Sequence, residues 1–534
     1  MSTKINQPRT NFNLASANQT IENTSQRVLI VGQSLNRGSL QGELIENIGN
    51  NGEEDVLFGS GAPLAQMVRA YKKRNKQVRV DTIALLEDAS MARLSLELML
   101  NFGENVISEP NTLRLVLGSS QEEYVIQLEV GDDIDAIDAK VFQATRTIDT
   151  DVFDIECSTI DSSTLGVFLG SQSRGSYASV NYVISASLDS ENELFSASVD
   201  TETNFTLGAG EPDLTAVFDS VAQERYQSIV WPYPNNLEPL TDFLDPRFNA
   251  DGIVVDGLGI TAINSTVSNL IDLGEAQNSA SLVVIAGKAN APVNGSEYYL
   301  GGDIPENPMY KAAQFAAIRS LRLDPLGFNI ADLVVGSNGA LDGFGGAALA
   351  SKPLFNTPFA NLPLSRTGEG FDAQEIQQLQ DVGISVLGNN IAGNGVIAGE
   401  IVTTYKTDAA GNPDETFKFL NYVDTSSQIR EFYFNNFRAR FAQSRLTEGD
   451  LVLGRDMANA NAVRSFAKRL FITLSGVDYV LVESGEEALT FFEENLFVTI
   501  DKAAGIVTII MTVPIVTQYR ETQATIRIAF SINS

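Results

Sequence analysis

The first hundred residues alternate between strand-like and helix-like segments, and this alternation constrains the fold of the chain more than any other feature. Residues 27–33 (RVLIVGQ) form a short apolar run that ends in glycine, as a buried parallel strand does. Residues 63–74 carry apolar side chains at helical spacing, starting at Pro63, and residues 76–85 (KQVRVDTIAL) predict the next strand. Together these segments predict a β-α-β unit.

The glycine patterns that bind nucleotide phosphates are missing from this unit. A dinucleotide site needs G-x-G-x-x-G directly after the first strand, and a P-loop needs G-x-x-x-x-G-K-[ST]. Gly59 and Gly61 precede the helix only after a long polar insert. Lys288, in IAGKANAP, follows a strand and a glycine but lacks the other residues of a phosphate loop, so a surface lysine is the favoured interpretation.

The spacing of apolar residues changes after residue 91. In RLSLELMLNF (93–102) apolar and polar side chains alternate, which indicates a strand with one buried face. Strand-like segments continue to about residue 207, interrupted by one expected helix over 132–146. From about residue 210 the α/β alternation returns, and helices are expected over 212–226 (PDLTAVFDSVAQERY), 267–276, 308–324 and 372–383.

This pattern predicts a multidomain chain of mixed α/β and α+β class. Its expected parts are an extended polar arm (1–26), a discontinuous α/β core domain (27–91 and 208–395), an inserted β-rich domain (92–207), and a C-terminal α+β domain (396–534) that ends in a strand-like arm over 522–534.

Composition excludes several classes of function. The formal net charge is −31, with 67 acidic and 36 basic residues, which argues against a binder of nucleic acid or of anionic lipid. No histidine is present, so catalysis by Ser-His-Asp and metal sites built on histidine are excluded. No segment approaches the length of an apolar membrane span, and no membrane insertion is expected. Composition thus removes the commonest general base of enzymes and the imidazole metal ligands, without settling whether the chain is an enzyme.

Two further features of the sequence are candidate sites of chemistry. Asp132, Asp133, Asp135 and Asp138 could suggest a divalent cation, but the calcium-loop pattern is absent and a helix start explains them better. Cys157 is the one cysteine, so it cannot form an internal disulfide, and a buried structural thiol is the favoured interpretation over a reactive one.

Residues 402–470 differ from the rest of the chain in charge. They hold ten basic residues against eight acidic ones, a local balance of +2. Arg464 and Lys468 stand one helical turn apart and share a face of an expected helix over 460–471. Two interpretations stay open, a neutral solvated face and a patch that complements an acidic partner.

The two ends of the chain form a second pair of candidates. An alternating strand at a terminus can add to the edge of a neighbour's sheet, and a polar arm can reach one. The alternative is that both ends pair within their own subunit. The apolar residues expected to make such strand contacts are Ile5, Phe12, Leu14, Ile526, Ile528, Phe530 and Ile532.

Several segments, in order along most of the chain, resemble the contractile tail sheath proteins of Mu-like phages. The resemblance rests on FGSGAPLAQMVRAYKKRNKQVRVDTIAL, SIVWPYPNNLEPLTDFLDPRFN, LVVIAGK, PMYKAAQFAAIRSLRLDP, LQDVGISVL and EIVTTYKTDAAGNPDETFKFLNYV. The sequence departs from that family in a longer segment over 289–307, in an excursion over 336–365, and in ANA in place of T-P-K at the start of the last long helix.

The resemblance implies a structural subunit that forms hexameric rings, stacked helically around a tail tube, and that contracts to drive the tube through the host envelope. It also implies that 92–207 is an outer domain, that 396–534 is an inner domain facing the tube, and that the subunit has no enzymatic activity and no cofactor. Its implied partners are copies of itself, the tail tube protein, and baseplate and tail terminator proteins. Its implied location is the virion tail, after assembly in the host cytoplasm. The residues implied to face the tube are Arg438, Arg440, Arg464, Lys468 and Arg469.

Three alternatives stay open beside this interpretation. One is the sheath of a related contractile injection or secretion system. The second is an α/β enzyme that acts on a phosphorylated substrate. The third is an adhesion protein of the virion exterior or of a surface layer.

Overall fold

The structure is a computed structural model. It describes residues 26–35, 42–49, 52–59, 61–87, 91, 93–102, 106–118, 122–146, 153–161, 164–174, 183–188, 195–200, 210–248, 254–288, 308–323, 350, 354, 357, 359, 370–389, 395–451, 456–476 and 480–517.

Eight strands form one sheet through the middle of the molecule. Six central strands run parallel, and the two edge strands run antiparallel to their neighbours. In spatial order the strands are β15 (Gly395–Ile397), β14 (Ile384–Asn389), β13 (Leu282–Lys288), β12 (Leu258–Ser265), β11 (Ser228–Val230), β1 (Arg27–Ser34), β3 (Arg79–Leu86) and β2 (Leu44–Ile45). The expected β-α-β unit is therefore present as β1, α2 (Pro63–Arg74) and β3, and the short helix α1 (Glu53–Phe58) lies within the polar insert that precedes α2.

Helices cover both faces of this sheet, which explains why its strands read as unbroken apolar runs. Val28 and Ile30 of β1 pack in one core with α2 and α7 (Pro308–Leu323). Leu29 and Val31 face the other side and share a core with α5 (Glu238–Phe248), α6 (Val267–Ala276) and α8 (Ala373–Asp381). Since all these β1 side chains are fully buried, each contributes about 1.5–3 kcal/mol of hydrophobic stabilisation.

Between β3 and residue 210, the described residues form two antiparallel sheets. One has the order β10 (Phe195–Asp200), β4 (Arg93–Phe102), β8 (Thr164–Arg174), β7 (Phe153–Asp161), and the other the order β6 (Glu122–Leu128), β5 (Asn111–Gly118), β9 (Val183–Leu188). Helix α3 (Ile134–Thr145) packs against β6 and β7, and the Asp133 carboxylate caps it by accepting a bond from the Ala136 N–H at 2.9 Å. The helix expected at this acidic cluster is thus confirmed.

The last part of the chain is built around one long helix. Helix α9 (Leu420–Phe441) packs on α10 (Ala460–Leu474) and shares a core with α11 (Glu486–Glu494). The Phe471 and Phe492 rings stack with centroids 4.4 Å apart and join α10 to α11. Two short pairs complete this part, parallel β16 (Arg445–Leu446) with β17 (Met457–Ala458), and antiparallel β18 (Phe497–Asp501) with β19 (Ile506–Ile510).

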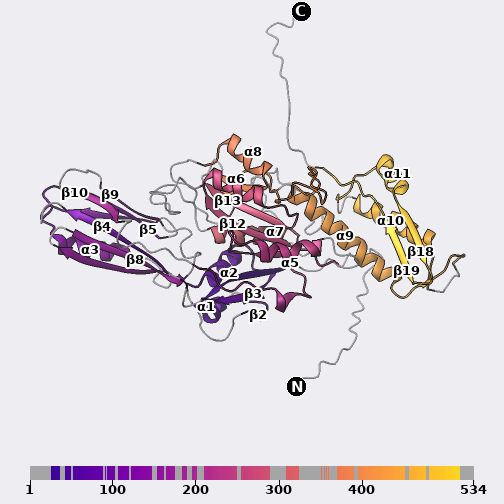
Figure 1. Cartoon of the computed structure of the whole chain (residues 1–534), viewed down its shortest axis with the longest axis horizontal. Coiled ribbons are helices and arrows are strands. Elements are labelled where there is room, and N and C mark those ends of the chain that lie inside the picture. Colours follow the sequence, from indigo (N-terminus) through magenta and orange to yellow (C-terminus); the bar gives the residue numbers. More distant parts are fainter. Residues whose placement is uncertain are drawn as a thin grey trace, which may run out of the picture.

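Figure 1 shows these three bodies in a row along the longest axis. The body containing β4 to β10 lies at one end, the eight-stranded sheet lies in the middle, and α10, α11 and the β18–β19 hairpin lie at the other end. Helix α9 runs from the middle body to the last one. The mixed α/β class is confirmed, while the exact boundaries of the four expected parts stay a prediction.

One expected helix is wrong. Residues 212–226 form turns and a single turn of 3-10 helix, η1 (Asp219–Val221), instead of an α-helix. Leu214, Val217 and Val221 do face the core, as their helical spacing suggested. The backbone reaches the same burial through bonds between residues three apart, such as Val221 N–H to the Phe218 carbonyl at 3.1 Å. Tertiary packing therefore overrode the helical pattern.

Candidate interaction surfaces

The edge of the sheet where α/β proteins bind nucleotides is filled by side chains. The strand order reverses between β1 and β11, and such a reversal is the usual place for a ligand. A Cβ added to Gly32, near the end of β1, would lie 2.5 Å from the Met67 Cε atom of α2. The next residue, Gln33, donates its amide to the Arg174 carbonyl at 2.9 Å. Packing thus occupies the position that a phosphate loop would use.

The other candidates for chemistry are engaged in structural contacts. The Lys288 Nζ atom lies 2.7 Å from a Glu375 carboxylate oxygen at the start of α8. Burial raises the pKa of the half-buried Cys157 thiol to about 11, with a smaller effect from Asp138, so the thiol is protonated at neutral pH. Within the described ranges, no three acidic, cysteine or histidine side chains are placed to hold a metal ion. No helix in those ranges is both long and apolar enough to cross a membrane.

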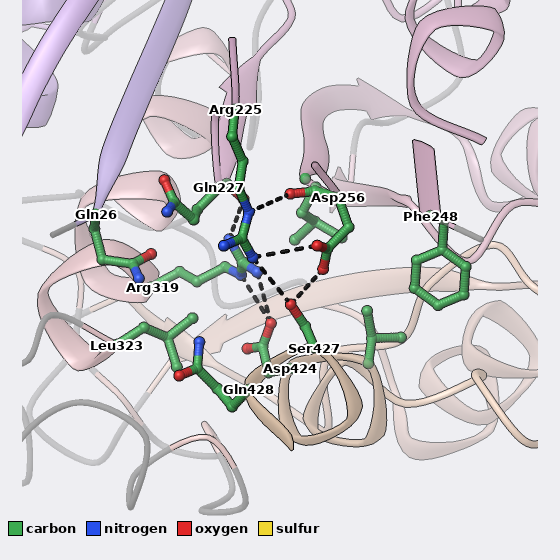
Figure 2. A pocket seen from close by; sticks show the side chains of 13 residues that line it. Gln26, Arg225, Gln227, Phe248, Asp256, Arg319, Leu323, Asp424, Ser427 and Gln428 are labelled. Atoms are coloured by element: carbon green, nitrogen blue, oxygen red, sulfur yellow. Dashed lines mark hydrogen bonds and ion pairs between the residues drawn. The ribbon is translucent and has the colours of Figure 1, made fainter. Parts of the chain in front are cut away.

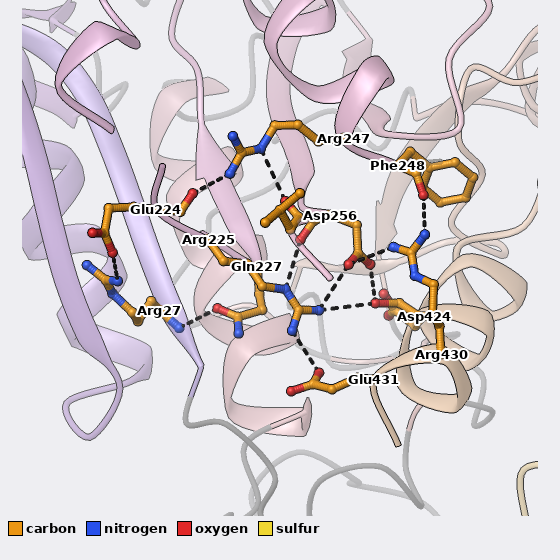
Figure 3. Close-up of polar contacts among 12 residues, drawn as sticks. Arg27, Glu224, Arg225, Gln227, Arg247, Phe248, Asp256, Asp424, Arg430 and Glu431 are labelled. Carbon is orange, nitrogen blue, oxygen red and sulfur yellow. Dashed lines mark hydrogen bonds and ion pairs between the residues drawn. The ribbon is translucent and has the colours of Figure 1, made fainter. Parts of the chain in front are cut away.

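A buried ionic network joins α9 to the eight-stranded sheet, and we call it the joint (Figure 3). At its centre Asp256, which precedes β12, lies 3.2 Å from the Arg225 guanidinium and 2.7 Å from that of Arg430 on α9. Arg225 also reaches across to Glu431 of α9 at 2.9 Å. Ser427 donates its hydroxyl to Asp256 from the same helix. Charged groups from both bodies therefore alternate through the joint.

A second ion pair extends the joint toward α7 (Figure 2). The Arg319 guanidinium donates from Nη2 and Nε to the same Asp424 oxygen at 2.7 and 3.1 Å. It also donates to the Ser228 hydroxyl at 2.8 Å and to the Gln227 carbonyl beside β11. The Asp424 side chain is fully buried and that of Arg319 is 6% exposed. One arginine thus links α7, α9 and β11.

The electrostatics of the joint favour the charged form of its central carboxylate. Burial by itself would raise the pKa of Asp256, but the opposite charges of Arg225 and Arg430 outweigh it and hold the pKa below its ordinary value. A carboxylate that is both buried and paired resists displacement, because water cannot replace its partners. The joint therefore fixes the orientation of α9 relative to the sheet.

A largely apolar groove runs along α9, between this helix and the strand β19, with Arg430 of the joint and Arg438 among its lining residues. On the helix its wall repeats about once per turn, at Ile429, Tyr433 and Phe437. The opposite wall consists of residues 506–509 followed by Met511, Val513 and Ile515. Since consecutive residues of β19 border the groove, the backbone edge of the strand itself faces it. We call this feature the α9–β19 groove.

In the part of the chain that the structure describes, the β18–β19 hairpin leaves strand edges without partners. Among the described residues, β19 pairs with β18 alone, so alternate N–H and C=O groups of β19 point away from β18. Ile506 and Ile510 are 55% and 61% exposed, whereas Val507 and Ile509 pack against the core shared with α9 and α10. An isolated two-stranded hairpin is marginally stable in water, so this one is suited to receive a further strand.

The basic residues expected to face a tube lie on two neighbouring helices. Arg438 and Arg440 are exposed in the last turn of α9, and Arg464 and Arg469 are exposed on α10. The two helices meet through Phe466, whose ring contacts Phe441 with centroids 5.3 Å apart. Lys468 differs from the others because its Nζ atom forms an ion pair with Glu493 of α11. The structure thus gathers these residues near one end of the molecule, with Lys468 already paired.

The candidates for strand contacts cannot be compared with the structure. The strand-arm residues Ile5, Phe12, Leu14, Ile526, Ile528, Phe530 and Ile532 lie outside the described residues.

The joint was not predicted from the sequence. A signal for it exists in α7, a largely apolar helix in which Arg319 and Arg322 are buried, as are Lys311 and Gln314. Charges in such a helix need partners in the interior, but the sequence does not say which.

This chain is similar in sequence to a phage tail component. It is 22% identical over 486 residues to the Mu-like prophage FluMu tail sheath protein of Haemophilus influenzae, and the alignment covers 89% of this chain and 87% of that protein. The resemblance to the tail sheath proteins of Mu-like phages is thereby confirmed. A comparison with protein-family models finds no match.

Solved structures give weaker likenesses. The helical sheath of the anti-feeding prophage in its contracted state is 10% identical, covers 99% of this chain and 100% of that chain, and aligns with a TM-score of 0.43. The D2–D3 domains of the flagellar cap protein FliD from Escherichia coli cover 23% of this chain and 78% of that one, with a TM-score of 0.15. Both scores are too low to establish a common fold.

Proposed function

We propose that this chain is the structural subunit of a contractile tail sheath, which forms hexameric rings stacked around a tail tube and contracts to drive the tube through a host envelope. The observation that carries the proposal is the similarity to a prophage tail sheath protein along 486 residues, which spans all three bodies of the molecule. The filled nucleotide edge and the engaged Lys288 count against the alternative of an enzyme for phosphorylated substrates.

The first partner is a second copy of the chain. The terminal arms, residues 1–26 and 522–534, add strands to the C-terminal body of neighbouring subunits, and the α9–β19 groove is the acceptor for the C-terminal arm. Each added main-chain hydrogen bond contributes a net ~0.5–1.5 kcal/mol, so one strand alone binds weakly. Several such contacts in a closed ring act together and hold the assembly.

The joint supports a movement of each subunit as one body. During contraction the subunits would rotate and move outward while their arms stay attached to their neighbours. A helix that slid against the sheet would absorb part of that movement. Because α9 is held by buried ion pairs, a displacement at the groove is passed to the eight-stranded sheet, as in other switches between two rigid packings.

The remaining partners belong to the same assembly. The exposed Arg438, Arg440, Arg464 and Arg469 would contact the tail tube, with Lys468 as a weaker contributor because Glu493 already pairs with it. Baseplate and tail terminator proteins would bind the two ends of the stack. The subunit would assemble in the host cytoplasm, reside in the virion tail, and act without a cofactor or an enzymatic activity.

Deleting residues 522–534 tests the arm contacts. The truncated chain is expected to remain a soluble folded monomer, because the three described cores are built from residues between Val28 and Ile515, and to lose polymerisation. Negative-stain electron microscopy of the full and truncated chains at equal concentration measures this. Normal tubular sheaths from the truncated chain would refute the arm proposal.

Charge reversal on α10 tests the tube contact. The double variant Arg464→Glu/Arg469→Glu should bind the tail tube protein of the same phage more weakly, and the deficit should grow as salt is lowered. Lys468→Glu serves as the matched control on the same helix, with a smaller expected effect because the wild-type lysine is paired with Glu493. Co-sedimentation with assembled tubes at two salt concentrations measures both. A salt-independent deficit would count against electrostatic docking.

A further inference from the structure

The chain leaves the described structure beside the α9–β19 groove. Val513 and Ile515 line the groove, and the last described residue is Thr517. Backbone bonds fix this exit point, since Val516 N–H donates to the Leu481 carbonyl at 3.2 Å and Glu483 N–H donates to the Pro514 carbonyl at 2.9 Å. The segment that follows therefore starts at the groove.

This segment has the pattern and the reach to fill the groove. Ile526, Ile528, Phe530 and Ile532 alternate with Arg527, Ala529 and Ser531, so a strand over 525–532 has one apolar face. The nine residues from Thr517 to Ile526 span at most about 30 Å when extended, and the five residues of β19 extend over roughly 17 Å. The linker is thus longer than β19, and it starts two residues after Ile515, which lines the groove.

We infer that the α9–β19 groove of the free subunit is occupied by the same chain's own C-terminal strand, which a neighbour's strand replaces during assembly. The replacement rests on the proposed function, whereas the occupation in the free subunit does not. Paired with β19, the segment would place its isoleucines beside Val507 and Ile509, the residues of β19 that already pack on the core. Its backbone would satisfy the outward groups of β19.

Mass action explains why the chain's own strand fills the groove first. A segment tethered by a short linker has an effective concentration in the millimolar range, far above the concentration of separate subunits in dilute solution. In an assembled ring the strands of neighbours are held equally close, and exchanging identical strands conserves every contact. Free subunits are thus protected from random association, while exchange on a growing sheath costs little.

Disulfide trapping with two isotopes distinguishes own from exchanged strands. In a Cys157→Ser background, Thr508→Cys on the exposed face of β19 is combined in turn with Thr525→Cys, Arg527→Cys or Ala529→Cys. Equal amounts of ¹⁴N- and ¹⁵N-labelled protein are mixed, oxidised and digested, and mass spectrometry identifies the isotope content of each disulfide-linked peptide pair. Val56→Cys, 80% exposed on α1, replaces Thr508→Cys as the control and should give no link.

At concentrations where sedimentation shows a monomer, at least one pair should link, and the linked peptides should be of like isotope only. In sheath polymers about half of the links should be mixed, the statistical share for full exchange. No like-isotope link from dilute monomer, for any of the three pairs, would overturn the inference. A failure to form polymers would instead contradict the proposed function and leave the result for the monomer standing.

A binding measurement covers the case in which these cysteines disturb folding. A fluorescent peptide of residues 522–534 should bind the chain truncated after residue 521, and bind the full chain at least about tenfold more weakly, because the tethered strand competes. Equal affinity for both chains would overturn the inference.

Discussion

Replacing Asp424 with asparagine should lower the free energy of unfolding by about 3 kcal/mol. Breaking a buried pair by removing one charge costs ~3–5 kcal/mol, because the other charge stays buried. The Asp424 side chain is fully buried, and that of Arg319 is 6% exposed. The loss should fall at the low end of the range, since Arg319 keeps its bonds to the Ser228 hydroxyl and the Gln227 carbonyl.

Urea unfolding followed by tryptophan fluorescence measures this loss in the body that contains the eight-stranded sheet. Trp231 is the one tryptophan of the chain, and it is fully buried in the core directly after β11, which Arg319 contacts through Ser228. The matched control is Glu46→Gln, which breaks the pair of Glu46 with Arg79 in the same body, where the two side chains are 59% and 37% exposed. That change should cost at most about 1 kcal/mol.

Two outcomes would refute this reasoning. One is an equal loss in Asp424→Asn and Glu46→Gln, which would mean that burial does not set the strength of the pair. The other is a loss in Asp424→Asn of less than about 1 kcal/mol, the range of exposed pairs. The double variant Arg319→Met/Asp424→Leu separates charge from packing, because it should recover most of the stability once no lone charge is buried.

Further changes test the electrostatics of the joint and one backbone position. The pKa of Asp256 is held below its ordinary value in the folded protein. The ionised carboxylate therefore stabilises the fold fully above about pH 4, and this stabilisation is lost as the pH falls through the lower folded pKa. The unfolding free energy of Asp256→Asn, which lacks this carboxylate, should thus fall less steeply below about pH 4 than that of wild type. Equal slopes in urea titrations would contradict this. Gly383→Ala should cost about 1–3 kcal/mol, because φ is +86° and a Cβ would lie 2.7 Å from the Thr404 Cα atom. Gly370→Ala, with open space around it, should stay within about 0.5 kcal/mol in the same assay.

Local patterns predicted those elements whose burial follows one regular period. The alternation over 93–102 became β4, and the helix expected over 372–383 became α8, which follows the Asp372 cap and ends before Gly383. Residues 212–226 show the limit, since turns can bury the same apolar residues as a helix. Helix α5 was not anticipated, although Leu240, Leu244 and Phe248 are buried along it, because Pro246 interrupts the signal.

The candidate surfaces were predictable only where they depend on one segment. The basic character of 402–470 can be read from composition alone, and the basic residues concerned lie on the two neighbouring helices α9 and α10. The joint depends on pairs such as Arg225 with Glu431 and Arg319 with Asp424, which lie more than a hundred residues apart in sequence. No local period encodes such a pair. The groove likewise exists only because α9 and β19 meet in space.

Helix α9 carries both the joint and the groove, and their arrangement along it determines how force can pass through the subunit. Asp424 and Ser427 lie in the half that faces the sheet, whereas Tyr433 and Phe437 line the groove farther along. An apolar contact between the helix and the sheet could shift by an ångström at small cost, because side chains repack. A shift of the ion pairs would leave buried charges without partners, so the joint has one favoured arrangement. Any strand bound in the groove is therefore coupled to the eight-stranded sheet through a helix that cannot slide.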